Sequence, residues 1–257
     1  MSDDQDFTRD EMMTVAAARL LTNSTVCFVG IGLPSAAANL ARLTHAPDVV
    51  LIYESGTIAT KPDVLPLSIG DGELAETART VVSVPEMFRY WLQGGRIDVG
   101  FLGAAQLDRW GNINTSVIGD YDKPKVRLPG GGGAPEIATN TGEVYVILRQ
   151  SKRTFVDHLD FVTSLGGGPR REGLRIPGKG PTKLITDLGV LEPDPETGEF
   201  TLVALHKGST VEQAVEATGW PLKVADTVVE TEVPTKDELS VLRDLNARTA
   251  KAHAGDA

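Results

Sequence analysis

A carboxylate stands where an apolar run of the sequence ends. Glu54 follows the β-branched and large apolar residues 49–53 and precedes Ser55-Gly56, a turn signal. Such a run is typical of a buried strand in a parallel sheet, and ligands gather at the carboxyl ends of these strands. Glu54 is therefore predicted to lie at the floor of a crevice, where partial removal from water makes a carboxylate a stronger nucleophile or base. Position alone leaves open a second interpretation, in which Glu54 caps a helix or orders a turn.

Two glycines could bring backbone N–H groups close to a ligand. Gly30 and Gly32 lie between a predicted strand and a predicted helix, where such groups can bind phosphate. Pro34 and Ala37 interrupt the glycine pattern of dinucleotide-binding folds, which leaves a nicotinamide site with Glu54 as its acidic partner as an alternative. The same two glycines would equally permit a sharp turn and close packing.

A second glycine segment, residues 129–135, holds four consecutive glycines between two prolines. Glycine loses much conformational entropy on folding, so this density favours a place where side chains would obstruct a ligand. Backbone N–H groups of such a loop can face a developing oxyanion, and loss of one donor typically costs about 3–4 kcal/mol of transition-state stabilisation. The alternative is a flexible hinge, although the two prolines stiffen both ends.

Other polar residues have structural explanations beside functional ones. Asp108, Asn112 and Asn114 follow a predicted strand, and Asx-turn chemistry accounts for them without a catalytic role. The four histidines share no spacing typical of a metal site, and we expect no metal; they are His45, His158, His206 and His253. Several cations could bind an anionic substrate or form a solvated surface; they are Lys61, Lys123, Lys125 and Arg127.

Composition limits the class of protein. The chain has 257 residues, 41% hydrophobic and 23% charged, which predicts a soluble globular protein with a sizeable core. A formal net charge of −10 argues against a general nucleic-acid binder, because binding phosphates needs a basic face. The acidic residues 1–6 precede no apolar signal segment, and no run reaches membrane-spanning length. The single cysteine, Cys27, fits a reducing cytoplasm, where we expect the protein to be found.

The first half of the chain alternates helical and strand patterns. Thr8 and Glu11 form a capping-box pattern that predicts an opening amphipathic helix. Strands are predicted at 25–29, 49–53 and 97–102, and helices at 35–43 and from Pro85 to Leu92. The order is that of an α/β protein with a mainly parallel sheet flanked by helices.

The second half continues the pattern. Strands are predicted at 144–148, 183–191 and 200–205, the last two as a hairpin around the turn 194–198. Capping boxes at Thr210 and Thr235 predict two late helices, and residues 166–172 are interpreted as a flexible surface loop. No repeat or linker divides the chain, so a single domain over residues 1–257 is expected.

Taken together, these motifs resemble those of the β subunits of class I CoA-transferases, over nearly the whole length. The resemblance is carried by Glu54-Ser55-Gly56, by the loop 30–34, by the glycines of 130–134, and by residues 101–106, 108–114 and 118–121. Within the family the chain is most similar to the 3-oxoadipate branch, with the glutaconate branch next, on the strength of residues 26–35 and 67–77.

The resemblance implies a class I CoA-transferase fold and roles for individual residues. Glu54 maps onto the family's nucleophile, which carries first an acyl anhydride and then CoA as a glutamyl thioester. Gly132 and Gly133 map onto the oxyanion site, with the register open by one residue, and Gly30 and Gly32 onto a coenzyme-binding loop. Coenzyme A would be a co-substrate, with no permanently bound cofactor and no metal.

The resemblance also implies a partner and a pathway. Family members of this length pair with an α subunit, as αβ or α2β2, and the α subunit supplies much of the CoA pocket. The expected reaction is transfer of CoA from succinyl-CoA to 3-oxoadipate in the breakdown of aromatic compounds. Neither nucleic acid nor membrane is an expected partner.

Three alternatives stay open at this stage. The acceptor could be glutaconate or another dicarboxylic acid. Glu54 could instead activate water, which would make the protein a CoA-thioester or carbon–carbon hydrolase of the same fold. In a third interpretation the protein is a non-catalytic ligand-binding α/β protein, with Glu54 contacting a ribose.

Overall fold

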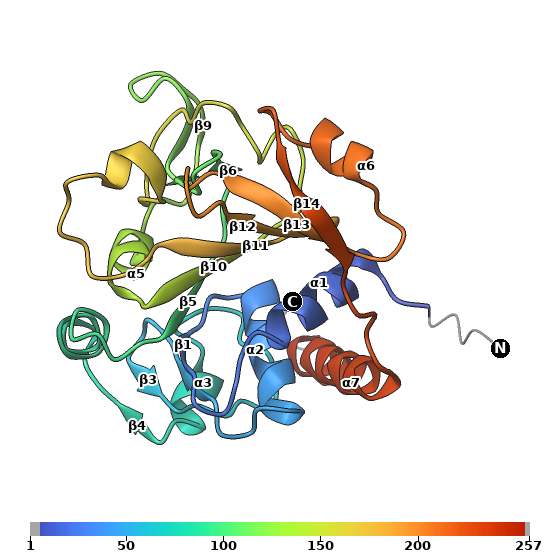
Figure 1. Ribbon diagram of the computed structural model, residues 1–257. Helices are drawn as coiled ribbons and strands as arrows, with labels where there is room; N and C mark the ends of the chain where they lie inside the picture. Colours follow the sequence, from blue (N-terminus) through green and yellow to red (C-terminus); the bar gives the residue numbers. More distant parts are fainter. Residues whose placement is uncertain (1–5, 255–257) are drawn as a thin grey trace. The chain divides into compact units, whose positions relative to one another are not determined.

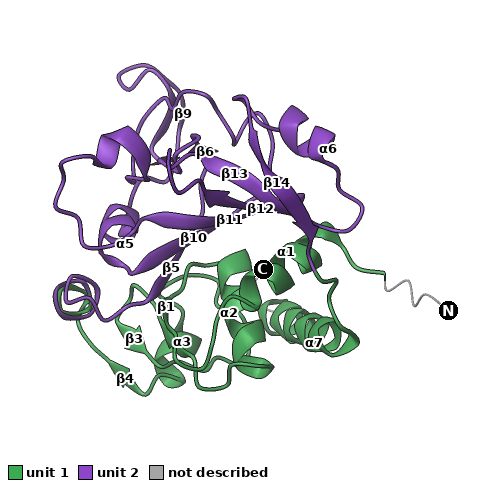
Figure 2. Ribbon diagram, in the orientation of Figure 1, with its two compact units in different colours: residues 1–87, 232–257 green, residues 88–231 purple. Residues whose placement is uncertain are grey.

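The structure is a computed structural model that describes residues 6–254, and it divides into two compact units (Figures 1 and 2). The first comprises residues 1–87 and 232–257, and the second comprises residues 88–231. The single domain expected over residues 1–257 remains a prediction. The acidic residues 1–5, which contribute to the expectation that no secretory signal is present, lie outside the described residues.

The first unit combines helices with a short sheet. Its strands follow the order β1-β2-β3-β4, in which β1 runs parallel to β2 and the two further pairings are antiparallel. The strands are β1 (Val26–Phe28), β2 (Val50–Ile52), β3 (Thr57–Ile58) and β4 (Thr80–Val81). The helices are α1 (Arg9–Ala18), α2 (Leu33–Leu43), α3 (Gly72–Glu76), α4 (Val84–Glu86) and α7 (Lys236–His253).

Three helices of this unit pack against one another. Buried alanines at 36–38 and 41 of α2 leave room for the close approach of α1, and α7 contacts both helices. Arg19 follows α1 and donates two hydrogen bonds, of 2.7 and 2.8 Å, to the Glu238 carboxylate of α7. Both helices begin with a capping box, as predicted from Thr8 and Thr235. The last helix of the chain is thereby attached to the first.

The second unit holds a six-stranded run in the order β5-β10-β11-β12-β13-β14. Strands β5, β10 and β11 are parallel, β12 is antiparallel to both neighbours, and β14 is parallel to β13. The run comprises β5 (Val99–Leu102), β10 (Glu143–Ile147), β11 (Pro181–Ile185), β12 (Gly189–Pro193), β13 (Phe200–Leu205) and β14 (Lys223–Glu230). Two hairpins and two helices complete the unit: β6 (Gln106–Leu107), β7 (Ile113–Asn114), β8 (Val117–Gly119), β9 (Pro124–Arg127), α5 (Ala134–Asn140) and α6 (Val211–Glu216).

The predicted fold class is confirmed. Parallel pairs form the centre of each sheet region, antiparallel strands are added beside them, and helices flank the strands. The helix predicted from Pro85 to Leu92 exists, although residues Met87–Leu92 form a π-helix. Cys27 is fully buried in β1, as expected of a small core residue.

The single strand predicted at 183–191 is wrong. A turn divides it into β11 and β12, because the Thr186 hydroxyl accepts hydrogen bonds from the N–H groups of Leu188 and Gly189. A Cβ atom at Gly189 would lie 2.1 Å from the Ala204 carbonyl oxygen. A glycine is needed where the two strands of this hairpin meet β13.

The flexible surface loop predicted at 166–172 is also corrected. Gly166 is buried against the backbone of residues 110–112, and Gly168 opens a 3₁₀ helix (Gly168–Arg171) beside the Trp110 ring. A Cβ atom at Gly168 would lie 2.3 Å from that ring. These glycines allow close packing against another loop, which sequence reasoning interpreted as mobility.

Candidate functional site

Glu54 lies on the hairpin that joins β2 to β3. The Tyr53 N–H donates to the Thr57 carbonyl at 3.1 Å, and the Gly56 N–H donates to the Tyr53 carbonyl at 3.0 Å. These bonds close a three-residue loop, Glu54-Ser55-Gly56, and Gly56 has a φ of +100° as its last residue. Glu54 thus follows the carboxyl end of β2, as predicted, but the chain turns back at once into an antiparallel strand.

Gly56 is needed for a second reason. A Cβ atom there would lie 2.0 Å from the Val82 carbonyl oxygen, and the Val82 N–H donates to the Gly56 carbonyl at 2.9 Å. The segment after β4 therefore closes over the hairpin. The backbone beside Glu54 is held on both sides.

The Glu54 side chain itself is left free. It is half-buried, and within residues 6–254 its carboxylate makes no hydrogen bond or ion pair. A carboxylate that capped a helix or ordered a turn would accept backbone N–H groups, and Glu54 accepts none from the described chain. The geometry leaves this carboxylate available to a ligand.

A buried hydrogen bond attaches the hairpin to α2. The Tyr53 hydroxyl and the Ser35 hydroxyl are 2.8 Å apart and both residues are fully buried. Burial raises the pKa of Tyr53 to about 12, against the opposing effect of the Ser35 hydrogen bond, so the phenol stays neutral. Asn39 supports the pair by donating to the Ser35 carbonyl at 3.0 Å. The residue before Glu54 is anchored in the first turn of a helix.

The Gly30–Gly32 loop lies at the same end of the first unit's sheet. The Val29 N–H donates to the Ile52 carbonyl at 2.8 Å, so the chain leaves β1 beside the point where it leaves β2 for Glu54. Gly32 has a φ of +80° and begins α2 without a side-chain cap. The first-turn N–H groups of α2 are therefore unsatisfied by any capping side chain and favour an anionic group.

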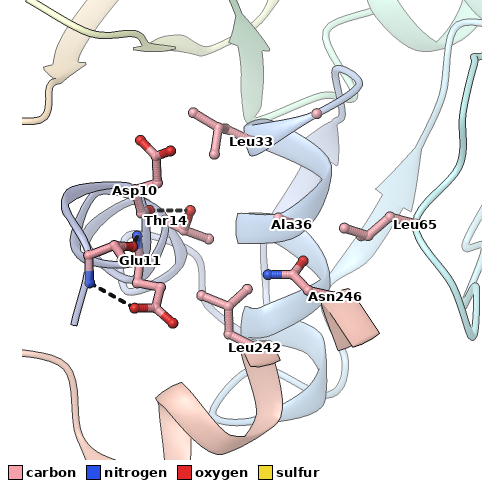
Figure 3. A pocket seen from close by; sticks show the side chains of 10 residues that line it. Asp10, Glu11, Thr14, Leu33, Ala36, Leu65, Leu242 and Asn246 are labelled. Atoms are coloured by element: carbon pink, nitrogen blue, oxygen red, sulfur yellow. Dashed lines mark hydrogen bonds between the residues drawn. The ribbon is translucent and has the colours of Figure 1, made fainter. Parts of the chain in front are cut away.

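A pocket of about 520 Å³ opens beside this loop (Figure 3). In Figure 3, Leu33 and Ala36 of α2 face Asp10 and Thr14 of α1, with Leu242 of α7 below. The hydrogen bond from the Arg243 guanidinium, 2.6 Å from Glu11, holds the pKa of this lining carboxyl below its usual value. Two acidic side chains, Asp10 and Glu11, make this pocket unsuitable for a phosphate.

The glycine loop belongs to the second unit and is held firmly. The Gly130 N–H donates to the Thr115 carbonyl, and the Thr115 hydroxyl donates back to the Gly130 carbonyl, both at 2.8 Å. Gly130 and Gly132 have φ values of +100° and +48°, and a Cβ atom at Gly131 would lie 3.1 Å from the Thr163 methyl group. These contacts argue against a flexible hinge.

The N–H groups of this loop have no acceptors. Gly131, Gly132 and Gly133 donate no backbone hydrogen bond to any residue in the described part of the chain. Gly133 is buried and precedes α5, so its free N–H group requires an acceptor from outside. Three adjacent free donors are the arrangement expected of an oxyanion site.

The structure thus brings together Glu54, Gly30 and Gly32 in the first unit, and it places Gly132 and Gly133 in the second. Each group is intact within its own unit. The hydroxyls of Ser55 and Thr57 and the Tyr53–Ser35 bond escaped sequence reasoning. The only available signal was the hydroxyl residues on either side of Gly56.

The polar cluster after β5 is structural, as interpreted from the sequence. The Asp108 carboxylate accepts from the N–H groups of Trp110 and Asn112, each at 3.0 Å, and from the Asn112 amide. Burial raises the pKa of Asp108, although these hydrogen bonds oppose it. Asn114 donates to Gln106 and to the Val117 carbonyl. All the predicted turn residues therefore have partners inside the fold.

The predicted cations are exposed. Lys61, Lys123, Lys125 and Arg127 form no ion pair with any described residue, and the Arg127 guanidinium lies 5.0 Å from the centre of the Tyr121 ring. Over residues 6–254 no cluster of His, Cys, Asp or Glu could hold a metal ion. No helix in this described range is long and apolar enough to cross a membrane.

Comparison with known proteins gives consistent relatives. Residues 10–217 match the family model of coenzyme A transferases. The chain is 67% identical to the β subunit of the 3-oxoadipate CoA-transferase of Pseudomonas knackmussii, covering 96% of each chain. It is 36% identical to the β subunit of the glutaconate CoA-transferase of Acidaminococcus fermentans, covering 95% of this chain and 94% of the relative.

Two further similarities complete the comparison. The crystal structure of the Acidaminococcus fermentans glutaconate CoA-transferase superposes with a TM-score of 0.88 at 33% identity, covering 95% of this chain and 97% of that one. The cholesterol ring-cleaving hydrolase IpdB subunit of Mycobacterium bovis is 28% identical, covering 92% of this chain and 93% of the relative.

Proposed function

Because the chain belongs to the coenzyme A transferase family, we propose that it is the β subunit of an enzyme that moves CoA from succinyl-CoA to 3-oxoadipate. The choice of acid is supported by the 67% identical relative, which carries that activity in its name. Coenzyme A is the co-substrate. The observation that carries the residue assignment is the Glu54 carboxylate, which is half-buried, unpaired and held on a rigid hairpin.

Glu54 is the proposed nucleophile. Its carboxylate attacks the succinyl-CoA carbonyl, and the tetrahedral oxyanion collapses with loss of CoA thiolate to leave a mixed anhydride on Glu54. The thiolate then attacks the glutamyl carbonyl, which releases succinate and leaves CoA bound to Glu54 as a thioester. The acceptor carboxylate attacks this thioester, and the same two steps run in reverse to give the new acyl-CoA. The thioester energy is conserved throughout, so the exchange requires no ATP.

The glycine loops have separate proposed roles. The free N–H groups of Gly132 and Gly133 stabilise the tetrahedral oxyanion, for which one donor is worth about 3 kcal/mol. The loop of Gly30 and Gly32 binds an anionic or amide part of CoA at the uncapped start of α2. The acidic pocket beside that loop is excluded from the phosphate path.

An α subunit is proposed to complete the site. The chain's net charge is −10, and no basic cavity for the CoA phosphates occurs in the part that the structure describes. The names of the relatives, each one subunit of a larger enzyme, support an αβ or α2β2 assembly in which residues 1–257 act as one subunit domain. The unpaired buried Cys27 is consistent with a cytoplasmic enzyme.

The test is an exchange assay on the complex with its α subunit. Succinyl-CoA and 3-oxoadipate should give 3-oxoadipyl-CoA with no free CoA, and Glu54→Gln should abolish the exchange because an amide cannot form the anhydride. A panel of acceptors that includes glutaconate and short 3-oxo acids ranks the substrates. Faster turnover with glutaconate than with 3-oxoadipate would overturn the choice of acid.

The same assay tests a second candidate. The ring-cleaving hydrolase relative shows that proteins of this similarity include hydrolases, so Glu54 could activate water. Stoichiometric release of free CoA in the absence of an acceptor acid would favour hydrolysis. The 67% identity to a transferase subunit favours transfer.

A further inference from the structure

Two hydroxyls beside Glu54 are buried without a partner. Ser55 Oγ and Thr57 Oγ1 make no hydrogen bond to any described group, and the only other buried side-chain atom of this kind in residues 6–254 is Ser164 Oγ. A buried hydroxyl that has lost its water without gaining a partner costs about 1–3 kcal/mol. Two of the three such costs in the described chain therefore fall on the three-residue segment that follows Glu54.

Thr57 is the sharper case because only 3% of it is exposed. It lies directly across the hairpin from Tyr53, since Ile52 pairs with Ile58 one step earlier. Residues opposite each other in an antiparallel pair project from the same face. Tyr53 uses its hydroxyl on Ser35, so this neighbour leaves Thr57 unsatisfied.

Other local groups are also committed. The N–H group of Tyr53 bonds to the Thr57 carbonyl, and the Gly56 carbonyl accepts from Val82. By contrast, the nearby threonine Thr60 is equally buried and its hydroxyl bonds to the Leu74 carbonyl at 2.9 Å and to Thr77 at 2.7 Å. The fold satisfies a buried threonine three residues away and leaves Thr57 open.

We propose that the Thr57 and Ser55 hydroxyls are catalytic hydrogen-bond donors to the oxygen atoms of the acyl group carried on Glu54. This assignment rests on the proposed role of Glu54 as covalent carrier. The hydroxyls make no bond to the resting carboxylate, so they do not stabilise the ground state. A bond that forms only after Glu54 is acylated lowers the barrier, because catalysis requires interactions stronger in the transition state than before it.

The bond changes are limited to hydrogen bonding. Attack by Glu54 on the thioester makes a tetrahedral oxyanion and then an anhydride with a carbonyl oxygen, and each oxygen accepts one O–H donor. No proton is transferred, so the hydroxyls are unchanged at the end of each half-reaction. The glycine N–H groups and these hydroxyls would act on the same intermediates.

The test compares Thr57→Val with Thr57→Ser and Thr60→Val, each in complex with the α subunit. Valine has nearly the shape of threonine and lacks only the hydroxyl. We expect Thr57→Val to leave the melting temperature unchanged or raised, since it removes an unsatisfied polar group, and to lower kcat about 100-fold. Thr57→Ser should keep most of kcat, and Ser55→Ala should lower kcat in the same direction.

Thr60→Val is the matched control. It removes a satisfied hydroxyl, so its melting temperature should fall while kcat per folded enzyme stays at the wild-type value. Wild-type kcat in Thr57→Val, or a joint fall of stability and kcat, would overturn the assignment.

Glu54→Gln separates this proposal from the proposed function. Full exchange activity in Glu54→Gln would mean that the carrier role is wrong. An inactive Glu54→Gln together with a fully active Thr57→Val would remove only the hydroxyl assignment. The KM for the acceptor acid should change less than kcat in Thr57→Val, because the donors act on the covalent states.

Discussion

At the scale of single residues, the neighbours of Glu54 are what make its carboxylate useful. Gly56 supplies the positive φ that turns the chain, and Tyr53 anchors the strand end, while the carboxylate itself has no partner in the described chain. A hydrogen bond or ion pair to the resting carboxylate would stabilise the state from which the reaction starts. Rigidity of the backbone combined with freedom of the side chain suits a nucleophile that is acylated and released in every turnover.

Gly56→Ala tests how far this backbone depends on glycine. The added Cβ would lie 2.0 Å from the Val82 carbonyl oxygen in a conformation with φ of +100°, so we expect a loss of about 2–4 kcal/mol of stability. Denaturant unfolding of the complex measures the loss. Gly72→Ala is the control, because no atom lies within 4 Å of its Cβ position and it starts α3. Equal stability of the two variants would show that Gly56 is not required.

Sequence reasoning could identify Glu54 as a candidate because the signal is local. An apolar run, one carboxylate and a Ser-Gly turn are consecutive in the chain. The Tyr53–Ser35 bond joins residues 18 positions apart, and the unsatisfied state of Thr57 depends on which groups surround it in three dimensions. Neither property is encoded in the spacing of residue types.

At the scale of elements, the hairpin and α2 form one mechanical unit. The Tyr53–Ser35 bond connects the end of β2 to the first turn of α2, and Asn39 and Arg42 extend the polar contacts along the helix to the Pro62 carbonyl. Gly32 begins that same helix. Movement of α2 would therefore carry both the Gly30–Gly32 loop and the residue before Glu54.

A double-mutant cycle on Tyr53→Phe and Ser35→Ala tests this connection. Each single variant leaves the other hydroxyl buried without its partner, so each should lose about 1–3 kcal/mol of stability. The double variant should lose less than the sum of the two, since no orphaned hydroxyl remains. Strict additivity in urea unfolding would show that the bond does not couple the hairpin to α2.

Elements with strong local signals were predictable, and short ones were not. The capping boxes at Thr8, Thr210 and Thr235 mark helices that the structure contains. Strands β3 and β4 have two residues each, too short for any periodicity, and they exist because neighbouring strands supply their hydrogen bonds. The break at Thr186 was missed because its side-chain bonds interrupt an apolar run that otherwise favours one strand.

At the scale of the whole molecule, the chain contains the parts of a site but not a complete one. Glu54 and the Gly30–Gly32 loop belong to one unit, and the free N–H groups of the glycine loop belong to the other. An acidic chain of net charge −10 offers only scattered exposed cations to a substrate as anionic as acyl-CoA. An α subunit that brings cations to Glu54 would account for both features.

The central claim is that Glu54 carries CoA covalently, and mass spectrometry of the trapped enzyme tests it most directly. The complex with its α subunit is incubated with succinyl-CoA without acceptor, then digested and analysed. We predict a peptide containing Glu54 that is heavier by one CoA attached as a thioester, that is reduced by borohydride, and that disappears when 3-oxoadipate is added. CoA attached to another residue, or full exchange activity with an unmodified Glu54 peptide throughout turnover, would contradict the account.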